Sequence, residues 1–356
     1  MAHIWKKHDP DGRVCYEMMK TPYKDRALAS ILGGAIGDAL GVTQEVFPQA
    51  EGIDAVQLQV LQQRSSRAYP QTEYEGGGPW ANRGLTLRPG EWTDDTAMML
   101  CLSDSILNKG KIDIADLMAR FANWANNGYN SCQEIAVGLG GNVKNAISKF
   151  DQDNPNMLCG GKDPAKDAGN GSLMRLAPVP VYWSHDLDTA LAMSRMQTAT
   201  THNVPECLDG SALMAFAVWC GINGASKEEM IMNLGNCPNL HDSSIVELAS
   251  PNARWLRCPD DDIRTLPGRC SWSLEAAFWC IHTSSGFKES VVKAINLGGD
   301  ADTVGSITGQ IAGALYGLEA IPESWLGNLM YADKIRTRAE SLFRHDPYDE
   351  LTMGLR

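Results

Sequence analysis

Long apolar runs and paired cysteines are both missing from this sequence of 356 residues. No apolar run approaches the roughly 18 residues that a membrane-spanning helix needs. The charged N-terminus lacks the apolar stretch of a secretory signal. The ten cysteines form no CxxC pair, and several lie within apolar runs, where a free thiol behaves as a small hydrophobic group. These absences predict a reduced, cytoplasmic protein that has no contact with a membrane.

Basic residues are also scarce. The chain has 31 Lys and Arg against 43 Asp and Glu, which gives a formal net charge of −12. A surface that binds nucleic acid needs clustered Lys and Arg to displace counterions from the phosphates. The composition therefore argues against a nucleic-acid partner, although it leaves room for local basic contacts to a single diphosphate.

Alternation of apolar and polar residues with a period of two, which is typical of half-buried strands, is scarce as well. Apolar residues instead recur at helical spacing almost throughout. The clearest helical stretches are 27–41, 98–106, 117–124, 208–219, 274–281 and 304–316. We predict an all-α protein with a polar N-terminal arm over residues 1–25, a helical domain over 26–356 and a proline-rich long loop over 236–270.

Two acidic segments, Thr93-Asp-Asp-Thr96 and Asp300-Ala-Asp-Thr303, each precede an apolar helical run. Helix capping explains one Asp or Thr at such a position. Two carboxylates per segment add a repulsion that a bound cation relieves. Oxygen ligands without His or Cys suit hard cations such as Mg²⁺, Mn²⁺ or Ca²⁺. Because four carboxylates exceed what one such ion needs, we expect a two-metal site.

A glycine-rich segment, Gly169-Asn-Gly-Ser172, is a second candidate binding element. Its glycines allow a positive φ and a close backbone approach to a ligand, and its N–H groups suit a phosphate, although an ordinary turn before a helix is an equal explanation. Arg175 is either a counter-charge for the ligand or a hydrogen-bonding hub. His202 is either a substrate contact or a helix cap.

Taken in order, these motifs resemble those of ADP-ribosylglycohydrolases, a family that includes the dinitrogenase reductase-activating glycohydrolase. The resemblance extends over residues 27–320. It implies a compact all-α fold with two Mg²⁺ or Mn²⁺ ions at the base of an ADP-ribose cleft. The motifs that carry it are Gly37-Asp-Ala-Leu-Gly41, Thr93-Asp-Asp-Thr96, Gly169-Asn-Gly-Ser172 with Met174-Arg175, Thr201-His202 and Gly298-Gly-Asp-Ala-Asp-Thr303.

The resemblance also implies a role for each matching residue. The implied metal ligands are Thr93, Asp94, Asp95, Asp300, Asp302 and Thr303. The implied substrate-binding residues are Gly169, Asn170, Gly171 and Ser172 along the diphosphate channel, with His202 on the nucleotide side. Glu45 matches a family glutamate close to the metals, and we expect Glu45 and Asp302 to be catalytic. Many arginine-type members carry an aspartate over the ribose where this chain has Gly138, and Glu134 would need a shifted loop to replace it.

These features predict a metal-dependent hydrolase that removes ADP-ribose from modified proteins, in the first place from arginine. The alternative is a non-catalytic binding protein, against which the intact carboxylates argue. Some bacterial relatives with an N-terminal arm act as immunity proteins against ADP-ribosylating toxins. Residues 1–25 fit such an arm, which would occlude the active site of the toxin. An arm that merely packs on its own domain is an equal explanation.

Overall fold

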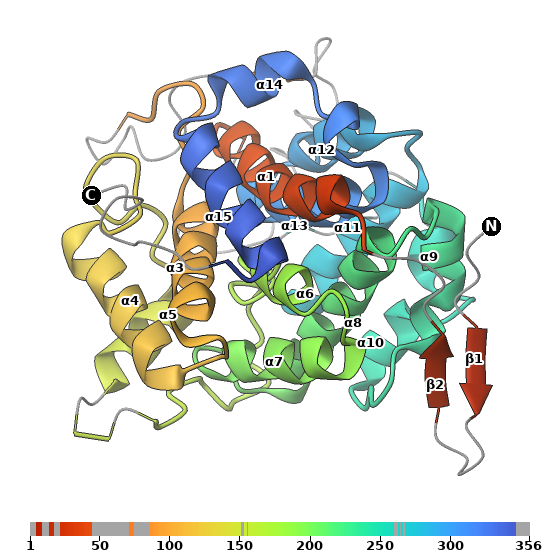
Figure 1. The fold of residues 1–356 in the computed structure, drawn as a ribbon, viewed down its shortest axis with the longest axis horizontal. Helices are drawn as coiled ribbons and strands as arrows, with labels where there is room; N and C mark the ends of the chain where they lie inside the picture. The colour runs from red at the N-terminus through yellow and green to blue at the C-terminus, as the bar shows by residue number, and fades with distance from the viewer. Residues whose placement is uncertain are drawn as a thin grey trace.

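The computed structural model describes residues 22–44, 71–74, 86–150, 153–154, 156–259, 263, 265 and 268–346, and the backbone of two short strands. These strands, β1 (Trp5–His8) and β2 (Val14–Glu17), pair antiparallel with each other. All other regular elements of the described residues are helices (Figure 1). The predicted all-α class is therefore confirmed, with a small hairpin added at the N-terminus. None of the described helices combines the length and the apolarity needed to span a bilayer.

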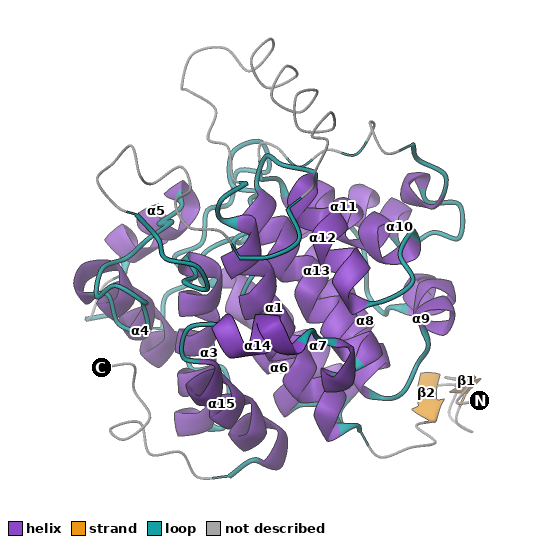
Figure 2. Ribbon diagram, turned by 90° about the horizontal axis from the view of Figure 1, so that it is seen from above, coloured by secondary structure: helices purple, strands orange, loops and turns teal. Residues whose placement is uncertain are grey.

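Helices α1 (Lys24–Gly41) and α13 (Ala301–Tyr316) run antiparallel through the centre of the molecule (Figures 1 and 2). Their backbones touch because small residues face each other along both helices. A Cβ atom placed on Gly37 would lie 2.0 Å from the carbonyl oxygen of Gly305, and one placed on Gly33 would lie 2.3 Å from that of Gly309. The glycines thus allow close packing of the two helices, which brings the C-terminal half of α1 to the N-terminus of α13.

The remaining helices surround this pair. Figures 1 and 2 show α3 to α5 on one side and α8 to α11 on the other. The helices are α3 (Asp94–Lys109), α4 (Ile114–Asn127), α5 (Gly141–Lys149), α6 (Pro178–Tyr182), α7 (Leu187–Ala199), α8 (Pro205–Ile222), α9 (Lys227–Asn233), α10 (Ser243–Leu248), α11 (Cys270–His282), α12 (Phe287–Asn296), α14 (Glu323–Asn328) and α15 (Ala332–Arg344). Short 3₁₀ turns lie at η2 (Leu234–Asn236), η3 (Arg254–Leu256) and η5 (Leu318–Ala320).

Local sequence signals fix several helix ends. The side chain of Asp113 accepts a hydrogen bond from the N–H of Asp116 and caps α4. Ser226 and Glu229 form a reciprocal capping box at the start of α9. Asp242 caps α10. The long loop predicted over 236–270 is therefore wrong in part, because α10 and η3 lie within it.

A buried ion pair between α3 and α15 supports the region beside the acidic motifs. Arg338 Nε donates to Asp104 Oδ1 at 2.8 Å, and both side chains are fully buried. Asp104 Oδ2 accepts from Tyr129 Oη at 2.8 Å and from Asn130 Nδ2 at 2.9 Å. The segment that follows α4 is therefore anchored to both helices, and both oxygens of the buried Asp104 carboxylate are hydrogen-bonded.

Candidate metal and substrate site

Asp38, in the last turn of α1, caps the N-terminus of α3 from outside that helix. Its carboxylate accepts hydrogen bonds from the backbone N–H groups of Thr93 and Thr96 and from both threonine hydroxyls, at 2.6–3.1 Å. Thr93, the N-cap residue of α3, makes no capping hydrogen bond with its own side chain. Because Asp38 meets this need, the carboxylates of Asp94 and Asp95 are left for another task.

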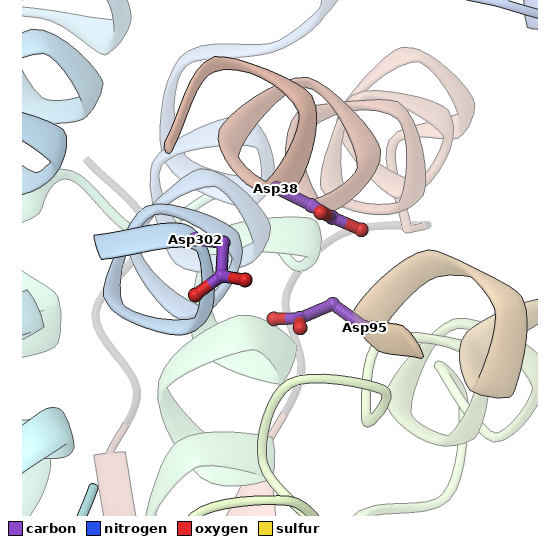
Figure 3. A group of neighbouring side chains, drawn as sticks. All are labelled: Asp38, Asp95 and Asp302. Carbon is purple, nitrogen blue, oxygen red and sulfur yellow. The ribbon is translucent and has the colours of Figure 1, made fainter. Parts of the chain in front are cut away.

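Three buried carboxylates converge where α1, α3 and α13 meet. Asp38, Asp95 and Asp302 each place an oxygen within 4.8 Å of the other two, and Figure 3 shows the three side chains pointing toward one another. Thr93 Oγ1 lies 3.5 Å from Asp302 Oδ2. Both oxygens of Asp38 accept hydrogen bonds from the start of α3. Asp95 Oδ1, in contrast, is buried and has no hydrogen-bond partner among the described residues. Asp95 therefore offers a buried, unpaired carboxylate oxygen to a cation within this cluster.

Asp94 and Asp300 lie beside this cluster and do not belong to it. The Asp94 carboxylate rests against the backbone of Gly138. Asp300 Oδ2 accepts a hydrogen bond of 2.6 Å from Asn170 Nδ2, which ties the second acidic motif to the glycine-rich segment. The N–H of Thr303 donates to Asp302 Oδ1 at 2.8 Å. The structure thus gathers all six predicted ligands in one region, with Asp38 added.

Burial and mutual repulsion both act on these carboxylates. Burial raises the pKa of Asp94 well above its ordinary value, and the charges of Asp302 and Asp38 raise it further. The pKa of Asp95 is raised well above its ordinary value by burial, followed by the charges of Asp38 and Asp302. A divalent cation relieves this repulsion and supplies the partner that Asp95 Oδ1 lacks. The donor set, which consists of oxygen atoms alone, therefore fits a hard divalent cation.

His202 and the segment Gly169-Asn-Gly-Ser172 form the second part of the site. The backbone at Gly169 and Gly171 passes so close to the imidazole that a Cβ on either glycine would lie 3.3 Å from His202 Nε2. Close approach is thus the reason for these glycines, since neither adopts the positive φ that the sequence suggested. The hydroxyl oxygen of the buried residue Ser172 has no hydrogen-bond partner among the described residues.

The protonation of His202 follows from its neighbours. Burial, followed by the charge of Arg175, lowers the pKa of His202 to about 3, so the imidazole is neutral in ordinary buffers. Arg175 Nη2 donates to Thr201 Oγ1 at 2.8 Å, and this oxygen lies 2.8 Å from His202 Nδ1. The Thr201 hydroxyl, as acceptor from Arg175, is free to donate to Nδ1, which assigns the ring proton to Nε2 on the side of the glycine-rich segment.

Arg175 is a hydrogen-bonding hub of the interior. Its fully buried guanidinium donates to the Gln197 side chain at 3.0 Å and to the carbonyl oxygen of Gly171 at 3.1 Å, and lies 4.6 Å from the centre of the Phe121 ring. Burial lowers its pKa to about 9. These contacts hold the glycine-rich segment in place, and they decide between the two roles that the sequence left open for Arg175.

The sequence profile of the ADP-ribosylglycohydrolase family matches residues 19–350. The chain belongs to this family. A solved structure titled "ADP-ribosylglycohydrolase-related protein complex" resembles it with a TM-score of 0.71 and 33% sequence identity, over 90% of this chain and 98% of that one. The all-α ADP-ribosylglycohydrolase fold inferred from the ordered motifs is therefore confirmed.

Similar proteins include three bacterial hydrolases. The chain is 32% identical to the ADP-ribosylarginine hydrolase Tri1 of Serratia proteamaculans, over 92% of this chain and 81% of that protein. It is 33% identical to the ADP-ribosylarginine hydrolase Tri1 of Pseudomonas putida, over 92% and 80%. It is 29% identical to the ADP-ribosyl-[dinitrogen reductase] glycohydrolase of Rhodospirillum rubrum, over 86% and 90%.

Three further acidic residues, two of them considered from the sequence, bear on the candidate site. Glu45, the expected base, lies outside the described residues. Glu134 is exposed and lines a cavity of about 350 Å³ with Asn123 and Tyr129. Asp38 was not assigned a role from the sequence, although it is the only charged residue of the apolar stretch 27–41. A charge in such a stretch is a signal, because a buried carboxylate persists only where it is paired or hydrogen-bonded.

Proposed function

We propose that this protein hydrolyses the bond between ADP-ribose and the guanidinium group of modified arginine side chains in proteins. One observation supports a hydrolytic site. Buried carboxylates gather at the start of α3 and α13, and Asp95 Oδ1 has no hydrogen-bond partner among the described residues. The relatives named as ADP-ribosylarginine hydrolases support the arginine linkage, because they match this chain over 92% of its length.

We further propose that the site holds two divalent cations, Mg²⁺ or Mn²⁺. Their ligands would be Thr93, Asp94, Asp95, Asp300, Asp302 and Thr303. Bound cations supply positive charge that orients the ribose hydroxyls and water and stabilises charge that develops at the reacting oxygens. The buried negative charge at this place supports the assignment, because burial and the mutual repulsion of the carboxylates both raise the pKa of Asp94 and of Asp95.

The protein residues would bind and orient the substrate. The Nε2–H of neutral His202 and the backbone around Gly171 would contact the diphosphate, where a neutral donor avoids the cost of burying a second charge beside Arg175. In the reaction the bond between the anomeric carbon and the guanidinium nitrogen breaks, water adds its oxygen to that carbon, and a proton passes to the nitrogen. Glu45 is the proposed base, on its match to the family glutamate.

Proteins carrying ADP-ribose on arginine alone or on serine alone test this function. We expect release of ADP-ribose from the arginine-linked protein in Mg²⁺ or Mn²⁺, and loss of release when EDTA is added and excess metal is not restored. The measurement is the amount of free ADP-ribose, separated chromatographically. Release from the serine-linked protein alone would refute the arginine assignment, and release that EDTA does not change would refute the metal assignment.

We also propose that the protein protects against an ADP-ribosylating toxin and that its N-terminal arm binds the toxin. The family profile begins at residue 19, after the hairpin of β1 and β2, so this hairpin is an addition to the shared fold. An added hairpin offers a second means of protection, because it can block a toxin directly while the metal site removes the modification.

Deletion of residues 1–18 separates these two activities. We expect the shortened protein to keep its hydrolase activity and to lose at least about tenfold in affinity for an ADP-ribosyltransferase encoded beside it, since the proposed binding arm is removed. Calorimetry with the purified transferase gives the affinity. Asp302→Asn is the reciprocal control, which should bind the transferase normally and lose most of its hydrolase activity. Equal affinity of the full-length and shortened proteins would refute this role for the arm.

A further inference from the structure

The carboxylate of Asp94 fills the space that a side chain at position 138 would need. A Cβ atom built on Gly138 would lie 1.8 Å from Asp94 Oδ1 and 2.6 Å from Asp94 Cγ. Gly138 also has a φ of 91°, which side chains rarely adopt. Two independent features of this position therefore require glycine, and one of them is the carboxylate of a predicted metal ligand.

The segment that carries Gly138 is held firmly at several points. Asn130 donates to the buried carboxylate of Asp104, and the Gln133 side chain donates to the carboxylate of the buried residue Glu91, just before α3. Val137 packs in a small apolar cluster with Val42 and Leu87. Because these contacts fix the backbone next to Gly138, the fold itself determines the space beside Gly138 that the Asp94 carboxylate occupies.

The position of the Asp94 carboxylate beside Gly138 affects the repulsion among the buried carboxylates. Asp94 is repelled by Asp302, Asp38 and Asp300, and its neighbour Asp95 already belongs to the three-carboxylate cluster. A fourth carboxylate within the cluster would increase the repulsion among buried charges. We propose that Gly138 is a positioning residue: because it lacks a side chain, it leaves room for the Asp94 carboxylate at the edge of the metal site, apart from Asp38, Asp95 and Asp302. The inference rests on the proposed metal site.

Gly138→Ala is the direct test. The atom that the new Cβ meets first is the tip of a short side chain that can rotate, so we expect the variant to fold and Asp94 to move. Two control variants separate this displacement from other effects. Gly110→Ala, at the C-terminal end of α3, introduces a side chain at a φ of 66°, with its nearest contact 3.6 Å away. Gly140→Ala changes the same loop, where a Cβ meets nothing within 4 Å.

We expect Gly138→Ala to weaken Mn²⁺ binding at least tenfold, measured by calorimetry, whereas Gly110→Ala and Gly140→Ala change the dissociation constant less than twofold. A residue that acts only on stability would lower the melting temperature of Gly138→Ala and Gly110→Ala alike and leave both affinities unchanged. That result, or a wild-type protein that binds neither Mn²⁺ nor Mg²⁺, would overturn the inference. Wild-type protein that binds metal but releases no ADP-ribose would refute the proposed function alone.

A double-mutant cycle shows whether Gly138 acts through Asp94. In the Asp94→Ala background the collision is gone, so the further change Gly138→Ala should alter the Mn²⁺ dissociation constant less than twofold. If Asp94→Ala binds no Mn²⁺, the cycle is measured on the melting temperature of the metal-free protein. Gly138→Ala should then lower it no more than Gly110→Ala does in the same background. Additive effects in the cycle would show that Gly138 has no specific connection to Asp94.

Discussion

Asp302→Asn should lower the rate of ADP-ribose release about 1,000-fold or more, because it removes one carboxylate of the buried three-carboxylate cluster from the proposed metal site, and a bound metal contributes several kcal/mol to catalysis. The same substitution should make the metal-free protein more stable. Asp302 is buried and adds to the charge that raises the pKa of both Asp94 and Asp95. A loss of activity together with a gain in stability is the signature of a functional residue held under electrostatic strain.

The gain in stability has a defined dependence on pH. The raised pKa values of Asp94 and Asp95 mean that the folded protein holds these protons more tightly than the unfolded chain does. The stability that this contributes is complete at low pH and is lost as the pH rises through the folded-state pKa values. The advantage of metal-free Asp302→Asn over wild type should therefore be small in acid and grow toward neutral pH, as followed by denaturant unfolding in EDTA.

Asp188→Asn is the matched control for this prediction. Asp188 also lies in the first turn of a helix, α7, but its side chain is exposed. We expect wild-type activity and a change in unfolding free energy within about 0.5 kcal/mol. A folded Asp302→Asn protein that hydrolyses its substrate at the wild-type rate would refute the participation of Asp302 in the site.

The sequence predicts the central helices because their apolar residues recur at helical spacing over long stretches, which argues against strands. α1, α8, α11 and α13 are buried on most sides, so their sequences are apolar almost throughout. α15 was not identified, since it buries only Ile335, Ala339 and Leu342 as apolar residues, with Arg338 among them. From the sequence alone, an arginine at this position is expected at the surface. Its buried partner Asp104 lies 234 residues away, so the sequence does not reveal the pair.

In the candidate site, too, contacts between residues far apart in the sequence were not predicted. Motif spacing identifies the acidic segments, because neighbouring residues carry their chemistry. It does not predict that Asp38 caps α3 from α1, since this contact spans 55 residues and depends on the packing of three helices. Nor does it predict that Asn170 reaches Asp300 across 130 residues. The sequence therefore gives the residue types of the site, and the tertiary contacts decide which of them remain open to a ligand.

Gly37→Ala should destabilise the protein by about 3 kcal/mol or more, which is a large share of the stability of an ordinary domain. The added Cβ would lie 2.0 Å from the carbonyl oxygen of Gly305 and 2.3 Å from its carbonyl carbon. Both atoms belong to the backbone of α13, so no side-chain rotation can relieve the collision and the two central helices must separate. Chemical denaturation gives the loss of unfolding free energy.

Gly327→Ala is the comparison for this substitution. Gly327 lies in α14, where a Cβ would meet nothing within 4 Å. Alanine favours the helix over glycine by about 0.5–1 kcal/mol at such a position, so this variant should be as stable as wild type or more so. Equal unfolding free energies for Gly37→Ala and wild type would contradict the close packing of α1 on α13.

The separation of α1 from α13 should also reach the metal site. Asp38 follows Gly37 directly and lies opposite Asp302, so a shift of α1 carries the cap of α3 away from the N-terminus of α13. Under conditions where Gly37→Ala is still folded, we expect its affinity for Mn²⁺ to fall together with its stability, whereas Gly327→Ala keeps the wild-type affinity. A folded Gly37→Ala protein with unchanged metal affinity would show that the carboxylate cluster tolerates movement between its two central helices.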